Sequence, residues 1–333
     1  MRTLIVGAGA LGSILGGYFA EAGADVTLVG RKAHLEAIRA HGLVIEGLRG
    51  RRLVRGLRVL EEPGEIEGAD LLILAVKSFD TAETLASLRH LRGRVGAALS
   101  VQNGGGKDEA LAETLGADAV VGATTIVGGS MPEPGRVVYT NDGMTWLGEL
   151  DGRPSARVEA IARLYRDAGL PVAVVPDIRC AIWCKLNQMV PAATLSCLTR
   201  LCLHEIYLDQ TLAALFVELS HEVAQVADRL GIPLGDFQGF PVQTLCSLPF
   251  AEAVESVRGR GRTMRERGLT QIKISTLQDL ERGRRTEAEQ TIGYVVDLAR
   301  AHNLSAPRLL LFYRILRGVE AAHEGRRAGR AGG

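Results

Sequence analysis

Two kinds of hydrophobic pattern divide the chain into a first half with strands and helices and a second half with helices alone. Over residues 1–175, short apolar runs alternate with segments of helical period, which is typical of βαβ units and a parallel sheet. From residue 176 only the 3.6-residue period of helices remains, interrupted by prolines. The pattern predicts an α/β domain over residues 1–175, an all-helical domain over residues 176–323, and a flexible, basic tail over residues 324–333.

The individual elements follow from the same pattern. Strands are expected at residues 2–6, 25–29, 70–76, 95–101, 119–127, 136–140, 144–149 and 171–175. Helices are expected at residues 7–21, 81–91, 107–115, 157–168, 178–202, 209–230, 242–258, 270–281, 286–302 and 307–322. The strands at 136–140 and 144–149 have period two and are predicted to be antiparallel strands that close the sheet.

Neither the balance of charges nor the length of the apolar runs indicates that the chain binds a polyanion or enters a membrane. Its 333 residues carry 39 basic and 38 acidic side chains, whereas affinity for a phosphate backbone requires many cations on one face. No run reaches the ~18 to 20 apolar residues that span a bilayer, and glycines interrupt the apolar N-terminus where a signal peptide would be continuous. We therefore expect a cytoplasmic protein with no nucleic-acid or membrane partner.

The five cysteines give no sign of a metal site or a disulfide framework. They form an odd set without a CxxC pair, at positions 180, 184, 197, 202 and 246. Four of them lie in apolar helical sequence, so we predict that they are buried as small hydrophobic residues and bind no metal.

A glycine-rich turn follows the first predicted strand directly and opens the first predicted helix. Its sequence is Gly7-Ala8-Gly9-Ala10-Leu11-Gly12. In a GxGxxG turn the first glycine permits the tight turn, the second lets a pyrophosphate approach the backbone, and the third lets helix and strand pack closely. Three glycines merely tolerated in a turn are the alternative, but the flanking strand and helix favour a Rossmann-type dinucleotide site with the phosphates at the helix N-terminus.

The residues after the second predicted strand bear on the choice of cofactor. An NAD enzyme usually places Asp or Glu there to bind the ribose 2′-hydroxyl, but this chain has Gly30-Arg31-Lys32. Two cations suit a 2′-phosphate, and the Arg31 guanidinium can bind it through two hydrogen bonds. The domain over residues 1–175 is therefore predicted to bind NADP, as NADPH, in preference to NAD.

Two polar side chains follow later strands at the carboxyl edge of the predicted sheet, where doubly wound proteins bind their ligands. Lys77 ends the strand at 70–76, and Asn103 follows the strand at 95–101. The amide of Asn103 offers both a donor and an acceptor to a nicotinamide or a substrate. A solvent-reaching lysine and an ordinary Asn-Gly turn are the alternatives; the shared edge favours ligand contacts for both residues.

The helical half carries two further charged candidates. Lys185 lies in the apolar sequence Ile-Trp-Cys-Lys-Leu, where burial would lower the pKa of its ammonium and suit it to donate a proton near neutral pH. A lysine in an ordinary salt bridge is the alternative. Glu287 follows Thr286 after a helix stop at Gly283, so a capping role in the first helical turn competes with contact to a ligand.

Together these segments resemble the ketopantoate reductase family over nearly the whole chain. The glycine fingerprint is shared by many dehydrogenases, whereas the WxKL and SxLQDxxxGRxTE pieces are not. The matching segments are GAGALG at 7–12, Gly30-Arg31, AVKSFDT at 75–81, VQNG at 101–104, GATT at 122–125, WCKL at 183–186 and STLQDLERGRRTE at 275–287.

The resemblance implies NADPH-dependent reduction of 2-dehydropantoate to pantoate, an oxidoreductase reaction on a CH–OH group in pantothenate and coenzyme A biosynthesis. By motif match, the residues that would hold the cofactor are the turn at 7–12, Arg31 on the 2′-phosphate, Lys77, Asn103 and Glu287. Lys185 is then the general acid, and it binds the substrate together with Asn103 and Ser275.

Two departures from the family pattern bear on the substrate. The family usually carries asparagines four and eight positions after the catalytic lysine, where this chain has Met189 and Ala193. Asn187 cannot replace them, since residues two apart on a helix point about 200° away from each other. The family's TEID pattern is also TEAE here, at residues 286–289. A relative that reduces a more apolar 2-oxo acid is therefore one alternative, and an NADP-binding regulatory protein with a decayed active site is another.

The partner expected from the sequence is thus a small-molecule 2-oxo acid. Pairing of two copies through the helical half stays open, because one sequence does not show which apolar helix face is free.

Overall fold

The computed structural model describes the backbone of residues 1–331 and the side chains of residues 1–322. The internal contacts divide the chain into two compact units. The first comprises residues 1–102 and 106–179, and the second comprises residues 103–105 together with the chain from Cys180 onward. The short loop at 103–105 therefore belongs by its contacts to a unit whose remaining residues lie far along the sequence.

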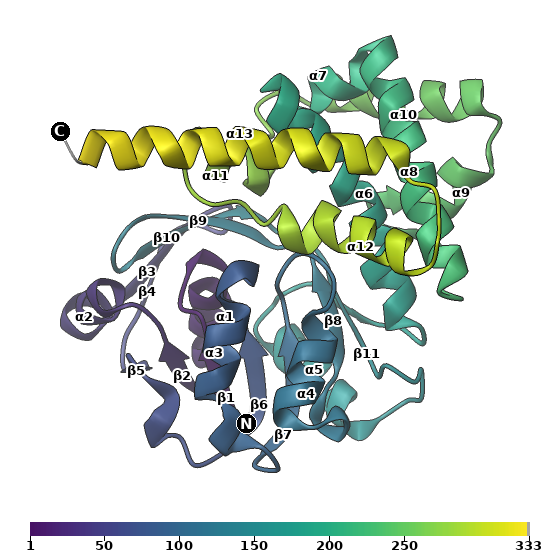
Figure 1. Cartoon of the computed structure of the whole chain (residues 1–333). Coiled ribbons are helices and arrows are strands. Elements are labelled where there is room, and N and C mark those ends of the chain that lie inside the picture. Colours follow the sequence, from purple (N-terminus) through teal and green to yellow (C-terminus); the bar gives the residue numbers. More distant parts are fainter. Residues whose placement is uncertain (332–333) are drawn as a thin grey trace. The chain divides into compact units, whose positions relative to one another are not determined.

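A five-stranded parallel sheet forms the centre of the first unit (Figure 1). Its order is β5-β2-β1-β6-β7, and every neighbouring pair is parallel. The strands are β1 (Arg2–Val6), β2 (Asp25–Val29), β5 (Arg58–Leu60), β6 (Ala69–Leu74) and β7 (Val95–Ser100). Ile5 enters one hydrophobic core while Leu4 and Val6 enter another, so the sheet is buried on both faces. The predicted doubly wound fold is confirmed.

Helices and two smaller sheets complete the first unit. The helices are α1 (Ala10–Glu21), α2 (Lys32–His41), α3 (Thr81–Ser87), α4 (Lys107–Leu115) and α5 (Ala156–Asp167). One small sheet has the order β4-β3-β10-β9, and the other has the order β12-β11-β8. Their strands are β3 (Leu43–Gly47), β4 (Arg52–Val54), β8 (Gly122–Thr125), β9 (Gly128–Glu133), β10 (Arg136–Asn141), β11 (Thr145–Gly148) and β12 (Val172–Val174).

The small sheets correct two predictions. The strands expected at 136–140 and 144–149 do not close one sheet: β10 lies between β3 and β9, whereas β11 lies between β8 and β12. Alternation predicts that a strand exists, but its partner depends on long-range packing. Residues 30–69, where the pattern predicted no element, contain α2, β3, β4 and β5, because strands of three to five residues with exposed charges leave little period to detect.

The second unit is helical. Its helices are α6 (Ile178–Thr199, with its first two residues counted in the first unit), α7 (Leu203–Leu208), α8 (Gln210–Arg229), α9 (Val242–Ser247), α10 (Phe250–Glu266), α11 (Ser275–Glu281), α12 (Tyr294–Ala301) and α13 (Pro307–Ala331). A five-residue π-turn, η5 (Glu289–Gly293), precedes α12. The long helix α13, yellow in Figure 1, packs against α8, α12 and η5.

Some predicted boundaries of the helical half differ from the structure. The helix expected at 242–258 is divided into α9 and α10, because Pro249 interrupts it. A two-residue hairpin, β13 (Asp236–Phe237) with β14 (Phe240–Pro241), lies where no strand was expected. The backbone of α13 continues to Ala331, past the predicted boundary at residue 323. Residues 332–333 of the predicted tail lie outside the described residues, and the flexibility of that tail stays a prediction.

Two general features of the described residues complete the picture. No helix within residues 1–331 is long and apolar enough to cross a bilayer. The five cysteines carry free thiols, and all but the partly exposed Cys246 are buried, as expected. Cys180 and Cys184 lie with their Sγ atoms 3.9 Å apart on α6. The neighbouring thiol and burial raise the pKa of Cys184, so this thiol stays protonated.

Candidate functional site

The glycine-rich turn has a backbone that excludes larger residues at two of its three glycines. Gly7 follows β1 with φ of +110°, and a Cβ there would lie 2.4 Å from Val76 N. A Cβ at Gly12 would lie 2.2 Å from Gly7 O. At Gly9, in contrast, an added Cβ would meet nothing within 4 Å. The protein's own packing thus requires the first and third glycines, whereas the second faces open space.

The N-terminus of α1 has the features of an anion site. Gly9 is its N-cap and supplies no side-chain hydrogen bond, and the first turn contains no acidic residue. Ser13 N bonds to Gly9 O at 2.9 Å, so the N–H groups before it lie ahead of the first intrahelical bond. Because β2 and β6 flank β1 on opposite sides, the strand order reverses here, and doubly wound folds bind ligands at such a point. The turn therefore fits the pyrophosphate of a dinucleotide.

Arg31 and Lys32 lie at the carboxyl end of β2 and the start of α2. The Arg31 side chain is 89% exposed, with Nη2 3.7 Å from Asp80 Oδ2. Lys32 Nζ lies 3.9 Å from Glu36 Oε1, also in solvent. Long, exposed ion pairs of this kind contribute little, so either cation can turn toward a phosphate.

Lys77 is partly buried at the carboxyl end of β6, at the edge the sequence predicted. Beside it lies Gln102, a buried residue that sequence reasoning missed although it belongs to the VQNG segment. Gln102 Nε2 donates to Val76 O at 2.9 Å, and its Oε1 accepts from Ser100 Oγ at 2.9 Å. This side chain therefore fixes the end of β7 to the end of β6, immediately before Asn103.

Three of the predicted site residues lie in hydrogen-bond contact within the second unit. Lys185 Nζ donates to Asn103 Oδ1 at 2.9 Å. Asn103 Nδ2 donates to Glu287 Oε2 at 3.3 Å. Lys185 and Asn103 are partly buried, and Glu287 is buried. A cation, an amide and a carboxylate thus form one chain that holds the lysine ammonium at a defined place.

Glycines allow the loop that carries Asn103 to pack closely against Gln290 and Tyr294. Gly105 N donates to Gln290 O at 3.0 Å. Gly104 has φ of +91°, and a Cβ there would lie 2.2 Å from Gln290 O. A Cβ at Gly105 would lie 2.0 Å from the ring of Tyr294. The run of three glycines after Asn103 was the sequence signal for this approach, and sequence reasoning did not use it.

The remaining substrate-side residues are not joined to this chain. Ser275 is exposed at the first position of α11, and no hydrogen bond among the described side chains joins it to Lys185 or Asn103. Met189 packs partly buried against the hydrophobic core of the second unit, and Ala193 is buried. Neither position of α6 therefore carries a side chain with an N–H or O–H donor.

Two buried polar side chains of the first unit were not predicted as site residues. Lys107 donates to two backbone carbonyl oxygens, at 2.5 and 2.7 Å, and burial lowers its pKa. His34 Nδ1 accepts from Gly135 N at 2.9 Å, so the neutral ring carries its proton on Nε2, 3.0 Å from Ser13 Oγ. Burial lowers the pKa of His34 as well. Both side chains brace the first unit.

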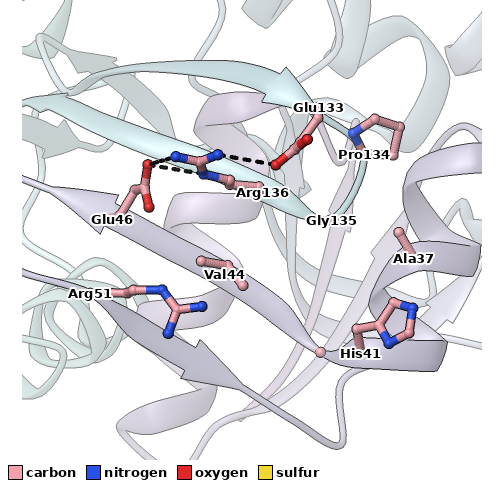
Figure 2. A pocket seen from close by; sticks show the side chains of 10 residues that line it. Ala37, His41, Val44, Glu46, Arg51, Glu133, Pro134, Gly135 and Arg136 are labelled. Atoms are coloured by element: carbon pink, nitrogen blue, oxygen red, sulfur yellow. Dashed lines mark hydrogen bonds and ion pairs between the residues drawn. The ribbon is translucent and has the colours of Figure 1, made fainter.

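Two surface pockets lie away from the predicted site residues. Figure 2 shows one of about 370 Å³ in the first unit, where Arg136 pairs with Glu46 and Glu133. Another, of about 620 Å³, lies beside Tyr207 and Arg260 in the second unit. Neither is lined by a predicted site residue.

Comparison with known proteins gives consistent results over both units. A family model described as "Ketopantoate reductase PanE/ApbA" matches residues 3–152, and its "C terminal" counterpart matches residues 177–320. The chain is 33% identical to the 2-dehydropantoate 2-reductase of Pyrococcus abyssi over 328 residues, which cover 96% of this chain and 98% of that protein. A PanE/ApbA family ketopantoate reductase structure from Ralstonia eutropha is 28% identical with a TM-score of 0.82, covering 97% of this chain and 100% of that one. A structure of D-mandelate dehydrogenase with NADH and anilino(oxo)acetate has a TM-score of 0.82 over the same shares of the two chains, but at 20% identity this likeness concerns the fold alone.

Proposed function

The chain belongs to the ketopantoate reductase family, as its motifs predicted, and we propose that it catalyses the NADPH-dependent reduction of 2-dehydropantoate to pantoate. Family membership makes it an oxidoreductase of the 2-dehydropantoate 2-reductase type, which confirms that prediction. The observation that carries the proposal is the hydrogen-bonded chain of Lys185, Asn103 and Glu287. It joins the residues that the family motifs assign to the acid and its neighbours, from three separate segments.

The first unit carries the groups that would bind the phosphates of the cofactor. The N-terminus of α1 would bind the pyrophosphate, and the open space at Gly9 lets the phosphates approach the backbone. Arg31 and Lys32 would bind a 2′-phosphate and so favour NADPH over NADH. Lys77 would contact the cofactor from the end of β6. When bound, the nicotinamide supplies the hydride.

Lys185 supplies the proton. As the carbonyl carbon is reduced, the ketone oxygen gains negative charge, and the Lys185 ammonium stabilises this charge and donates its proton to the oxygen. The lysine is left as a neutral amine, which takes a proton from solvent before the next turnover. Because Asn103 Nδ2 faces the Glu287 carboxylate, Asn103 Oδ1 faces Nζ and holds it in place. Asn103 and Ser275 would also bind the substrate.

A more apolar 2-oxo acid is the second candidate substrate, and Met189 and Ala193 favour it. Their side chains cannot form hydrogen bonds with polar groups of an acid such as 2-dehydropantoate. A site lined by amides selects substrates whose polar groups form hydrogen bonds with those amides. A site lined by apolar side chains selects such substrates only weakly.

Steady-state assays separate these substrates and test the cofactor. The purified protein is given 2-dehydropantoate, pyruvate and 2-oxo acids with branched and aromatic side chains, each with NADPH and with NADH. The proposal expects the highest kcat/KM for 2-dehydropantoate with NADPH. A higher kcat/KM for an apolar 2-oxo acid would mean that this acid, and not 2-dehydropantoate, is the substrate. Tight NADPH binding without turnover of any of these acids would indicate a regulatory protein instead.

A further inference from the structure

Glu287 lies in irregular backbone. Helix α11 ends at Glu281, residues 284–288 form no helix, and the next helical bonds belong to the π-turn Glu289–Gly293. Such π-turns are rare and often occur at functional sites. Thr291 holds the backbone on the C-terminal side, since its N and Oγ1 donate to Glu287 O at 3.1 and 2.8 Å. No helical bond holds the residues just before Glu287, and side chains from elsewhere contact that segment.

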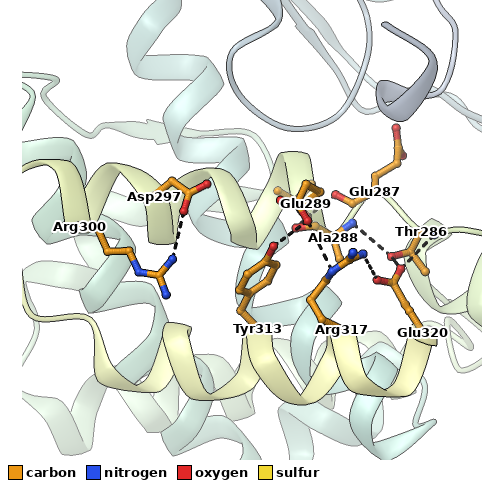
Figure 3. Close-up of polar contacts among 10 residues, drawn as sticks. Thr286, Glu287, Ala288, Glu289, Asp297, Arg300, Tyr313, Arg317 and Glu320 are labelled. Atoms are coloured by element: carbon orange, nitrogen blue, oxygen red, sulfur yellow. Dashed lines mark hydrogen bonds and ion pairs between the residues drawn. The ribbon is translucent and has the colours of Figure 1, made fainter. Parts of the chain in front are cut away.

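One face of α13 supplies these side chains, as Figure 3 shows. The buried Glu320 carboxylate accepts hydrogen bonds from Thr286 N at 3.2 Å and from Thr286 Oγ1. Thr286 Oγ1 in turn accepts from Ala288 N at 3.2 Å. Arg317 Nη1 lies 2.7 Å from Glu320 Oε2 and balances its charge. The backbone on both sides of Glu287 is thus tied to one buried carboxylate.

The same helix face also holds the start of the π-turn. Tyr313 Oη donates to Glu289 Oε2 at 2.6 Å, and Arg317 Nε lies 3.5 Å from the same oxygen. Burial and the Glu289 carboxylate raise the pKa of Tyr313 to about 12, so its hydroxyl remains a donor. Positions 313, 317 and 320 are four and three residues apart and therefore share one side of the helix.

The π-turn is joined on its other side to the loop that carries Asn103, because Gly105 N donates to Gln290 O. The orientation of the Asn103 amide depends on this arrangement. With Glu287 in place to accept from Nδ2, the oxygen Oδ1 faces Lys185. If Glu287 moved away, a rotated amide would present N–H groups to an ammonium that is itself only a donor.

We propose that Glu320, supported by Arg317 and Tyr313, is a positioning residue for the proton donor. It holds the segment of Glu287, Glu287 orients the Asn103 amide, and the amide holds Lys185 Nζ. This inference rests on the proposed function in so far as Lys185 donates the proton. It gives α13 a part in the reaction through its contacts with the segment that carries Glu287.

Kinetics of full-length variants test the proposal. Glu320→Ala is expected to lower kcat with 2-dehydropantoate about 10- to 100-fold, the scale of a misplaced catalytic group. The Kd for NADPH should change much less, because the predicted phosphate contacts lie in the first unit. Glu320→Gln keeps an acceptor for Thr286 and should recover part of that loss. The matched control is Asp297→Ala, which breaks the exposed pair of Asp297 with Arg300 drawn in Figure 3 and should leave kcat unchanged.

A double variant shows whether Glu320 acts through Glu287. If it does, Glu287→Gln combined with Glu320→Ala turns over no more slowly than Glu287→Gln alone. A double variant whose loss equals the product of the two single losses overturns the proposal, because it means that Glu320 acts independently.

Hydrogen exchange in the intact protein tests the same idea without turnover. Should the wild type reduce no 2-oxo acid, the proposed function fails while this measurement still applies. Glu320→Ala is expected to accelerate exchange at residues 286–293 and 103–106 and to leave α10 at wild-type rates. No acceleration, an acceleration confined to residues 286–293, or one spread over the whole second unit overturns the positioning role.

Discussion

In the glycine turn of the first unit, the closest contacts of Gly7 and Gly12 lie within the turn itself or with Ala75 and Val76, which follow strand β6. The second region is the hydrogen-bonded site of Lys185, Asn103 and Glu287 in the second unit, called the acid site below. Its three polar groups come from segments far apart in the sequence. The turn is shaped by excluded volume, since an added Cβ at Gly7 or Gly12 would strike backbone. The acid site is shaped by the direction of hydrogen bonds. Substitutions in the glycine turn should therefore disturb the structure by steric overlap. Substitutions in the site of Lys185, Asn103 and Glu287 should act by changing the orientation of hydrogen-bonding groups.

The largest expected effect is on the acid itself. Lys185→Ala removes the proposed proton donor and should lower kcat by about 10²- to 10⁴-fold, the usual contribution of general acid catalysis. NADPH binding, measured by fluorescence titration, should be unchanged because the predicted phosphate contacts lie in the other unit. Lys273→Ala is the control, since this lysine pairs with Glu281 near the surface. Near-normal turnover in Lys185→Ala would assign the proton to another group.

A pair of glycine variants tests whether the turn depends on excluded volume. Gly12→Ala places a Cβ against Gly7 O and should lower the free energy of unfolding by about 1–3 kcal/mol, with loss of NADPH binding. Gly9→Ala adds a methyl group to open space, so thermal and urea unfolding should change little. NADPH affinity should nevertheless fall about tenfold or more, because the methyl group occupies space that the phosphates need. Equal destabilisation by the two variants would contradict the distinct roles of the two glycines.

Arg31 gives a smaller and more selective effect. Arg31→Ala should raise the Kd for NADPH about 10- to 100-fold, the size of one or two hydrogen bonds to a charged group, and leave the Kd for NADH unchanged. The exposed Arg51, in the pocket of Figure 2, provides the control variant Arg51→Ala. A parallel loss of affinity for both cofactors would mean that Arg31 does not bind the 2′-phosphate.

The smallest effect concerns pH and the first unit alone. Burial lowers the pKa of His34 from 6.5, so the unfolded chain takes up a proton near that pH that the folded protein does not. The contribution of neutral His34 to stability is thus present above about pH 6.5 and is lost as the pH falls below it. In urea unfolding, the free energy of unfolding of His34→Gln should fall less between pH 7.5 and 5.5 than that of the wild type. Parallel slopes would show that His34 is not the titrating group.

The difference between the regions also explains what the sequence could predict. The parallel sheet and the turn at 7–12 depend on local period and glycine spacing, which one sequence displays. Lys185 and Glu287 were predicted as site residues from motifs, but the motifs did not predict the hydrogen bonds that join them through Asn103. Asn103 was predicted beside Lys77 at the sheet edge, yet its loop packs with the second unit.

Other features left no local signal. Glu320 is a charged residue in a predicted helix, and only the folded chain shows that it is buried against Thr286. β10 pairs with β3, a strand of five residues that lies about ninety positions earlier in the chain, and with β9. Such pairings are decided by contacts between segments far apart in the chain, which periodicity does not encode.

Residues 103–105 belong by their contacts to the second unit, and this affects how the chain can be divided in a chimaeric protein. A chimaera of two relatives, joined between Arg179 and Cys180, would combine the amide of one parent with the lysine and carboxylate of the other. Gly105 would also have to fit a foreign Tyr294, against which it leaves no space for a side chain. Such hybrids should be most active when the loop is exchanged together with the helical half, because its contacts belong to that unit although it lies among residues of the first unit in the sequence.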